Sequence, residues 1–338
     1  MLTIALDAMG GDIGVKNNIH GAILALQEFP IKILLTGNKD LIQKELENYS
    51  DVDQSRLIIE HCEESISMED SPTKAYRQKK NSSVHVGLKH VKENKAKAFV
   101  SAGNTGAILT ASTMILGRSK GVERPALASA IPGDNGPFVL LDLGSNVDCK
   151  SSHLKQFAIM GHYFAKYILH IEKPKIGLLN IGEEKEKGNN LTLETYPLLK
   201  DLPYDFIGNI EANHILFNEA DVVVCDGFVG NNILKFAESF SKLLSSFFRG
   251  ASKNSFMAKI GLLFLNCELK KLKKKFSYDT YGGAQLLGIN GVSIIAHGSA
   301  KGLAIKNAIR VAIESVESQM VEQIAKNIVK YHKDSEKK

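Results

Sequence analysis

The sequence contains few cysteines, and their spacing excludes two kinds of protein. All four lie far apart and none belongs to a C-x-x-C pair: Cys62, Cys149, Cys225 and Cys267. This spacing argues against a structural zinc site and against a disulfide framework. We therefore expect a protein of the reducing cytosol.

Long apolar runs are also missing. Only residues 2–6 form an apolar run before the first charged residue, Asp7, and this run is too short for the core of a signal peptide. No run approaches the roughly 18 apolar residues of a membrane span. The sequence therefore predicts a cytoplasmic chain.

The common catalytic signatures are absent as well. The sequence has no G-x-S-x-G elbow, no H-E-x-x-H pair and no Walker lysine loop. Cys149 comes nearest to a nucleophile, but buried or inert thiols are the commoner case. We therefore do not expect covalent catalysis.

The overall composition is that of a folded soluble protein. The 338 residues are 44% hydrophobic and 23% charged, enough for one large α/β domain or two modest ones. The net charge of +5 favours acidic partners or anionic surfaces without requiring nucleic acid. Part of this excess is local, because five lysines fall within 270–275 and three within the last six residues.

Five apolar runs of strand length end abruptly in turns of small and polar residues. In an α/β sheet, ligands bind in the crevice outside the carboxyl ends of the strands, so the repeated turns predict one assembled site. The run and turn pairs are 2–6 with 7–12, 98–100 with 101–106, 138–141 with 142–146, 176–179 with 180–189, and 222–224 with 226–231.

Between these turns, strand and helix patterns alternate, which implies parallel pairing of the strands. Further strands are expected at 31–35 and 56–60, and helices at 39–50, 72–94, 107–116, 154–170 and 233–248. We expect residues 1–330 to form a single α/β domain, with a charged tail at 331–338.

Two of the turns have the composition of a ligand-binding site. Residues 7–12 combine two carboxylates with adjacent glycines and form either a ligand-binding turn or a tight turn capped by aspartate. They do not follow the G-x-G-x-x-G pattern of a dinucleotide site. Residues 101–106 place hydroxyls, an amide and glycine N–H groups just before a helix, which favours a phosphate cradle over a plain helix cap.

Three single residues stand out, each with an ordinary alternative. Lys187 lies on a glycine-flanked loop, where it meets a phosphate or a developing oxyanion, or is a solvated lysine. Asn231 is either a helix cap or an amide directed at a ligand. His297 is a general acid, a phosphate contact or a structural histidine. Neutral donors with one loop cation suit a nucleophile that already carries charge, such as phosphate attacking an activated carbonyl.

Residues 254–276 are apolar first and basic afterwards. This order fits a core or dimer helix with a solvated lysine face, and it fits equally a segment in contact with a membrane.

The order of the motifs resembles the PlsX family of phosphate acyltransferases. The residues that carry the resemblance are 7–12, 101–107, 180–184 with 187–189, 226–231, and 281–284 with 297–298. The resemblance implies that acyl-acyl carrier protein and inorganic phosphate give acyl-phosphate and free carrier protein, without a cofactor or metal. The acyl-phosphate would supply the next acyltransferase of bacterial phospholipid synthesis, a glycerol-3-phosphate acyltransferase of the PlsY type.

The resemblance also implies a three-layer α/β/α doubly wound sheet similar to isopropylmalate dehydrogenase and phosphotransacetylase, in a homodimer attached peripherally to the membrane. It implies catalysis by Lys187 and Asn231. The residues expected to line the pocket are Asp7, Gly10, Gly11, Asp12, Ser101, Asn104, Thr105, Gly188 and His297. The helical segment 233–278 would protrude, with Leu262, Leu263, Phe264, Lys270 and Lys271 facing the membrane or a partner.

The chain departs from the family pattern at several positions. Residues 13–14 are Ile-Gly for the usual Ala-Pro, residue 145 is serine for alanine, and Gln285 replaces a proline. Residues 208–214 lack the arginine of the usual Glu-Gly-Arg-Asp, which leaves the role of this loop open.

Two other classes of function remain. A metal- and NAD-dependent hydroxy-acid dehydrogenase on the same fold predicts a carboxylate cluster, for which Asp221 and Asp226 are the only close pair near a strand end. A non-enzymatic carrier-protein or membrane scaffold would leave the five polar turns unexplained.

Overall fold

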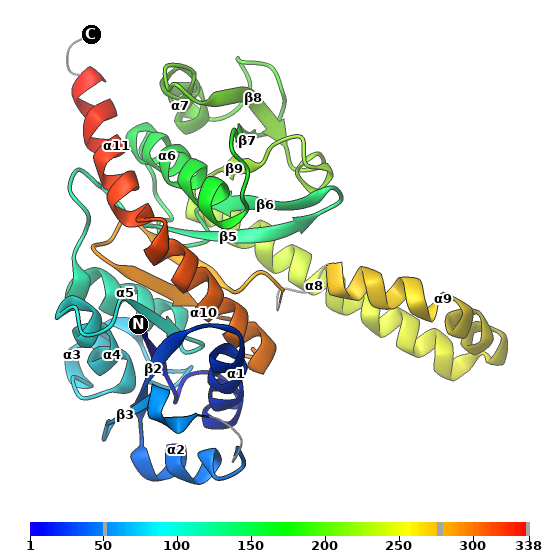
Figure 1. Cartoon of the computed structure of the whole chain (residues 1–338). Helices are drawn as coiled ribbons and strands as arrows, with labels where there is room; N and C mark the ends of the chain where they lie inside the picture. Colours follow the sequence, from blue (N-terminus) through cyan, green and yellow to red (C-terminus); the bar gives the residue numbers. More distant parts are fainter. Residues whose placement is uncertain (50–52, 276–279, 336–338) are drawn as a thin grey trace.

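A single mixed sheet of eleven strands runs through the whole molecule (Figure 1). The computed structural model describes residues 1–49, 53–275 and 280–335, and leaves out the side chains of 252–254, 258, 270–275 and 332–335. The strand order is β3-β2-β1-β4-β11-β10-β5-β6-β9-β7-β8. The strands are β1 Leu2–Asp7, β2 Ile31–Gly37, β3 Leu57–His61, β4 Ala98–Ser101, β5 Ala126–Gly133, β6 Gly136–Leu141, β7 Lys175–Asn180, β8 Asp205–Glu211, β9 Val222–Val224, β10 Ala284–Leu287 and β11 Val292–Ile295.

Helices cover both faces of this sheet. They are α1 Val15–Glu28, α2 Lys39–Leu46, α3 Pro72–Gln78, α4 Ser83–Lys92, α5 Thr105–Leu116, α6 Ser151–Ile168, α7 Asn190–Lys200, α8 Gly227–Asn254, α9 Phe256–Lys275, α10 Gly302–Glu317 and α11 Met320–Ser335, with short 3-10 turns at Gln54–Arg56 and Ile215–Phe217. One apolar core joins the sheet to α1, α6, α10 and α11, and a second joins it to α3, α4 and α5. The three-layer prediction is confirmed.

The strands do not all point the same way, which matters for the site. Strands β1, β2, β3, β4 and β11 are mutually parallel. Strands β10, β5 and β6 are joined by antiparallel pairs, and β9, β7 and β8 then run parallel to β6. The carboxyl ends of β1 and β4 therefore lie on one edge of the sheet, and those of β6, β7 and β9 on the other.

Local differences from the sequence prediction have simple causes. Residues 72–94 form two helices, because Ser82 pairs with Glu64 in an isolated bridge and its hydroxyl caps α4 at the N–H of His85. Helix α11 continues to Ser335, so the first part of the expected tail is helical.

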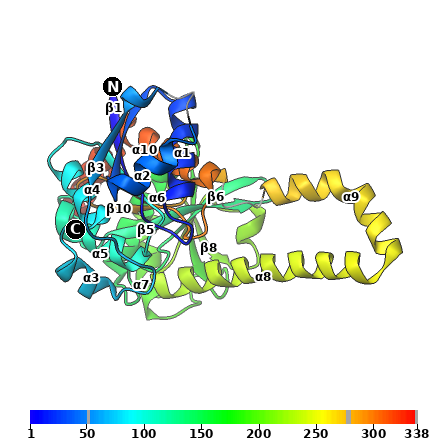
Figure 2. The ribbon, with the colours of Figure 1, turned by 90° about the horizontal axis from the view of Figure 1, so that it is seen from below.

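Helices α8 and α9 form an antiparallel hairpin that projects from the body (Figure 2). Apolar side chains are strongly exposed along it, with Phe236 at 73% and Phe264 at 85%. Within the part of the chain that the structure describes, no helix has both the length and the apolar character that a bilayer crossing requires. Helix α8 begins at Gly227, among the polar strand ends, so this hairpin is continuous with the candidate site.

Candidate active site

The turns after β1, β4 and β11 meet at one edge of the sheet. We call residues 7–12, 101–106 and 297–298 the first strand-end group. The Ser101 hydroxyl donates to Asp7 Oδ2 at 2.6 Å, and the Asp12 N–H donates to the Gly298 carbonyl at 2.8 Å. The structure thus brings together residues that lie almost 300 positions apart in the sequence.

Two glycines let these turns approach one another. A side chain at Gly10 would place its Cβ 2.7 Å from both Asp7 Oδ2 and the Gly103 nitrogen. Gly11 has φ +91°, and a Cβ there would lie 2.9 Å from the Gly298 oxygen. Packing therefore requires glycine at both positions, and the backbone conformation requires it at Gly11 as well.

Much of the donor capacity of the 101–106 turn is already used inside the protein. The Gly103 N–H donates to the Ser101 hydroxyl at 3.0 Å. The Asn104 amide donates to the carbonyls of Met68 at 2.9 Å and Asp70 at 3.0 Å, and its oxygen caps α5 at the Ala107 N–H. The side chain of Asn104 therefore braces a neighbouring loop.

The donors that remain are at the start of α5. Thr105 is exposed, and among the described residues neither its N–H nor that of Gly106 has an acceptor. The first N–H groups of a helix carry a partial positive charge and attract anions. Of the three residues predicted to bind phosphate in this turn, Thr105 therefore keeps donors for a ligand, whereas Ser101 and Asn104 use theirs within the protein; phosphate binding here stays a prediction.

Asp7 is a buried carboxyl with unusual electrostatics. Burial raises its pKa, and hydrogen bonds from Ser101 and the N–H of Met9 oppose that shift in part. Its Oδ1 accepts the Met9 N–H at 3.0 Å and its Oδ2 accepts the Ser101 hydroxyl, so it stabilises the turn that follows β1.

The turns after β6, β7 and β9 form the second strand-end group, residues 142–146, 180–188 and 226–231. Asp142 is fully buried and accepts hydrogen bonds from the N–H groups of Leu127 at 2.9 Å, Ser145 at 3.2 Å and Asn146 at 2.6 Å. These donors satisfy the buried carboxylate and fix the turn that follows β6.

Asn231 is placed by the start of α8. Asp226 caps the helix at the Val229 N–H, and the Gly227 N–H donates to the Asn146 carbonyl at 2.8 Å. Gly144 has φ +113°, and its position would put a Cβ 3.3 Å from that of Asn231. Asn231 is exposed. Because Asp226 caps α8, the side-chain amide of Asn231 is not needed as a helix cap and is available to a ligand.

Lys187 lies on the loop between β7 and α7. The Asn180 amide donates to the Lys187 carbonyl at 2.9 Å, and the Asn209 amide donates to the Glu184 carbonyl at 2.8 Å. Gly188 has φ +110°, which lets the loop turn tightly into α7. The Lys187 side chain is exposed and has no carboxylate partner among the residues that the structure describes.

The first turns of α8 connect the two strand-end groups. Glu238 lies seven residues after Asn231, and its Oε1 is 3.8 Å from Nε2 of His297. Seven residues make about two helical turns, or roughly 10 Å, so the two side chains share one face of the helix. The predicted residues therefore fall in two groups joined by α8, and not at a single edge of the sheet.

The loop that departs from the family pattern carries a cluster of its own. Nδ1 of His214 is 2.5 Å from Glu219 and 3.9 Å from Glu183, and the bond to Glu219 raises the pKa of His214. Within the described residues, these three side chains are the group that could hold a metal ion, with ligand atoms within 4.8 Å of one another. All three are at least partly exposed, and the paired histidine and glutamate also form a simple surface ion pair.

Three of the four cysteines, Cys62, Cys149 and Cys225, are unsuited to nucleophilic chemistry. Burial, with the nearby charges of Asp142 and Asp226, raises the pKa of Cys149 to about 12. Burial also raises the pKa of Cys62 to about 12, and that of Cys225 well above its usual value. Thiols are reactive as thiolates, which such groups hardly form at neutral pH.

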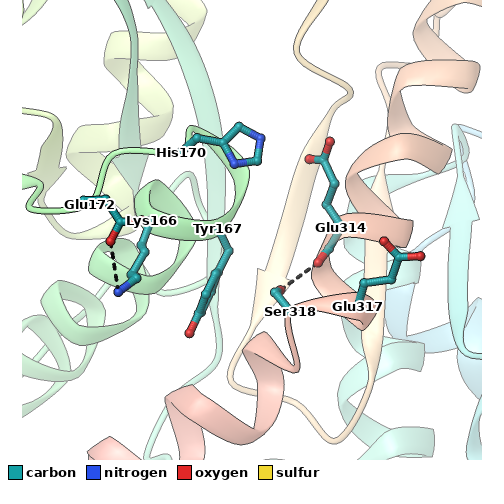
Figure 3. A pocket seen from close by; sticks show the side chains of 7 residues that line it. All are labelled: Lys166, Tyr167, His170, Glu172, Glu314, Glu317 and Ser318. Carbon is teal, nitrogen blue, oxygen red and sulfur yellow. Dashed lines mark hydrogen bonds and ion pairs between the residues drawn. The ribbon is translucent and has the colours of Figure 1, made fainter.

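A separate hollow of about 310 Å³ lies between the C-terminal parts of α6 and α10 (Figure 3). It is lined by Lys166, Tyr167, His170, Glu172, Glu314, Glu317 and Ser318, none of which the sequence singles out.

The membrane-facing prediction concerns the hairpin. Leu263 and Phe264 are exposed on α9, at 66% and 85%, while Leu262 is half-buried. Lys270 and Lys271 belong to α9, but their side chains lie outside the described residues.

Comparison with known proteins now decides the family. A profile described as "Fatty acid synthesis protein" matches residues 2–323. A phosphate acyltransferase of Clostridium perfringens strain SM101 is 45% identical over 339 residues, covering 100% of both chains. One of Alkaliphilus oremlandii is 46% identical over 327 residues, 97% of each chain. The chain belongs to the PlsX family of phosphate acyltransferases. It is an acyltransferase, as the order of its motifs predicts.

Solved structures show the fold. A phosphotransacetylase from Streptococcus pyogenes superposes with a TM-score of 0.66 at 14% identity, covering 94% of each chain. A 4-hydroxythreonine-4-phosphate dehydrogenase from Klebsiella pneumoniae superposes with a TM-score of 0.53 at 10% identity, covering 94% of this chain and 99% of that one. The predicted relationship to phosphotransacetylases and dehydrogenases is confirmed at the level of the fold.

Sequence reasoning missed two carboxylates in this region. Asp142 was recognisable only as part of a small, polar turn, although its burial organises that turn. Glu238 was hidden within a helix pattern, yet its spacing of seven from Asn231 places both on one face.

Proposed function

We propose that the chain transfers the acyl group of an acyl-acyl carrier protein to inorganic phosphate, giving acyl-phosphate and free carrier protein for phospholipid synthesis. The observation that carries the proposal is the helix start at Thr105, where unpaired N–H groups face solvent in a protein of the phosphate acyltransferase family.

The proposed reaction is a substitution at the thioester carbonyl. A phosphate oxygen forms a bond to the carbonyl carbon, the carbonyl oxygen becomes an oxyanion, and the carbon–sulfur bond then breaks. Lys187 orients the phosphate or stabilises the oxyanion, and the Asn231 amide donates a hydrogen bond nearby. The leaving thiolate has a pKa of roughly 8.5 and needs little protonation, so no strong general acid is required.

The hairpin is proposed to bring the site to an anionic membrane surface and to contribute to a homodimer. The exposed apolar side chains of α8 and α9 support this proposal, since soluble monomers rarely leave such surface uncovered. An acyl-phosphate with a long chain suits transfer at a membrane, where an acyltransferase of the PlsY type would use it. The continuous sheet supports a single domain over residues 1–330.

The dehydrogenase alternative finds little support in the carboxylates that it needs. Asp221 and Asp226 lie at opposite ends of β9, which runs from Val222 to Val224. Asp221 accepts the Lys175 N–H at 2.8 Å, and Asp226 caps α8. Both are thus used locally.

The test is a direct assay with purified protein, phosphate and acyl carrier proteins of different acyl chain length, in which acyl-phosphate is detected. We expect phosphate-dependent product without nicotinamide and in the presence of EDTA. Thioester turnover that requires nicotinamide would favour the dehydrogenase, and no phosphate-dependent cleavage at all would favour a scaffold.

A further inference from the structure

Glu238 is a carboxylate that is largely shielded from water, on a helix that is mostly exposed. Its side chain is only 13% exposed, whereas Phe236 and Phe240, on other faces of α8, are 73% and 51% exposed. Burial of a carboxylate is costly unless partners compensate for the lost water. The placement of a charge on the inward face and of phenylalanine on the outward face indicates a specific role for Glu238.

Each oxygen of this carboxylate has its own partner. Oε2 lies 3.2 Å from Nζ of Lys235, one turn earlier on α8. Oε1 lies 3.8 Å from Nε2 of His297, which belongs to the turn after β11. Lys235 balances the negative charge of Glu238 from within α8. His297 is the partner of Glu238 that lies outside α8.

The contacts of the other ring nitrogen of His297 favour one tautomer. Nδ1 accepts the N–H of Ser299 at 3.2 Å and lies 2.9 Å from the Ser299 hydroxyl. A nitrogen that accepts a hydrogen bond carries a lone pair, so the proton of the neutral ring is on Nε2. This nitrogen lies 3.8 Å from Oε1 of Glu238, an electrostatic contact that is longer than a hydrogen bond.

The turn that holds His297 is tied to the phosphate side of the site. The Gly298 carbonyl accepts the Asp12 N–H at 2.8 Å, and the Ala296 N–H donates to the Ser101 carbonyl at 2.8 Å. On the other side, Glu238 is two turns along α8 from Asn231. The contact between Glu238 and His297 therefore joins the first strand-end group to the helix that carries Asn231.

We propose that Glu238 is a positioning residue for acyl transfer. Together with the Ser299 N–H, it favours the Nε2–H tautomer of His297, and it sets the distance between the start of α5, where phosphate would bind, and the Asn231 amide. This inference rests on the proposed function. Reacting groups must be held closely, and a misplacement of about 1 Å typically costs on the order of 100-fold in rate.

The variant Glu238→Gln keeps the shape of the side chain and removes its charge. We expect kcat to fall by about 10- to 100-fold, with the KM for phosphate changed less than about threefold. Nitrogen-15 NMR of the histidine ring should show His297 as the Nε2–H tautomer in the wild type and as a mixture in the variant. Glu28→Gln is the matched control, because Glu28 pairs with Lys306 at 2.6 Å away from the site.

The two readouts separate positioning from general damage. Wild-type turnover in Glu238→Gln would overturn the proposal. Lost turnover with an unchanged His297 tautomer would also overturn it, because a merely structural role would give that result. If the wild type forms no acyl-phosphate, the proposed function fails, whereas the NMR comparison still decides whether Glu238 holds His297.

Discussion

The hydroxyl of Ser101 donates a hydrogen bond of 2.6 Å to Asp7, and both side chains are buried. They come from the carboxyl ends of the neighbouring strands β4 and β1. A carboxyl in such a place depends on its neighbours for every hydrogen bond that water would otherwise supply. The pair therefore supports the turns on which the phosphate side of the site is built.

Removing that donor should destabilise the fold. We expect Ser101→Ala to lower the free energy of unfolding by about 1–3 kcal/mol, the typical cost of leaving a buried polar group unsatisfied. Urea denaturation at pH 7 measures this. Ser55→Ala is the control, because Ser55 donates a bond of the same length, 2.6 Å, to the exposed Asp53. Its loss should cost no more than about 0.5 kcal/mol, and equal losses would contradict the role of burial.

The raised pKa of Asp7 predicts a dependence of stability on pH. Its folded-state pKa lies above its ordinary value of 3.8, so the protonated form favours the folded state. Its contribution to the free energy of unfolding is largest below 3.8 and is lost as the pH rises through the folded-state value. Asp7→Asn, which cannot ionise, should therefore gain stability relative to the wild type between pH 4 and pH 8. Parallel pH profiles in urea denaturation would contradict the assignment.

Lys187 should matter far more than its neighbour Lys185, although both are exposed on the same loop. If Lys187 orients phosphate or stabilises the oxyanion, Lys187→Ala should lower turnover by at least about 100-fold. Lys185→Ala changes the net charge equally and should stay near the wild-type rate. The measurement is acyl-phosphate formation at saturating phosphate, and wild-type turnover by Lys187→Ala would remove its assignment.

The hairpin can be tested without enzyme activity. We expect the protein to float with anionic liposomes. The double variant Leu263→Glu, Phe264→Glu should remain in the unbound fraction, because two carboxylates oppose insertion at an anionic surface. The control Met114→Glu alters an apolar side chain that is 61% exposed on α5, in the body of the protein. Flotation of the double variant would exclude membrane contact through this part of α9.

The apolar runs predict seven of the eleven strands that the structure describes and miss β5, β8, β10 and β11. Apolar runs marked β1, β2 and β9 clearly. Strand β5 is rich in small residues, and β10 follows a glycine-rich stretch, so neither shows the β-branched pattern of a strand. The antiparallel pairs made by these two strands reverse the direction of β6, β9, β7 and β8 relative to β1 and β4. Without them, the polar turns could only be expected at one edge.

The residue types of the site could be predicted from the sequence. Which of its hydrogen-bond donors are already paired within the protein could not. Residues 101–104 precede a helix, as expected, and that helix begins at Thr105, two residues before the predicted start at 107. Nothing in the sequence shows that the Asn104 amide is occupied by carbonyls more than thirty residues away. That information depends on tertiary contacts, which local patterns do not contain.

The central position of β10 and β11 constrains how the chain can fold during synthesis. These strands, residues 284–295, fill the gap between β4 and β5, which are made much earlier. Until they emerge from the ribosome, one edge of each of those two apolar strands lacks its partner, and unpaired strand edges promote association with other chains. The sheet of this enzyme can therefore be completed only after residues 284–295 have been synthesised. Products truncated before these residues should be prone to aggregate.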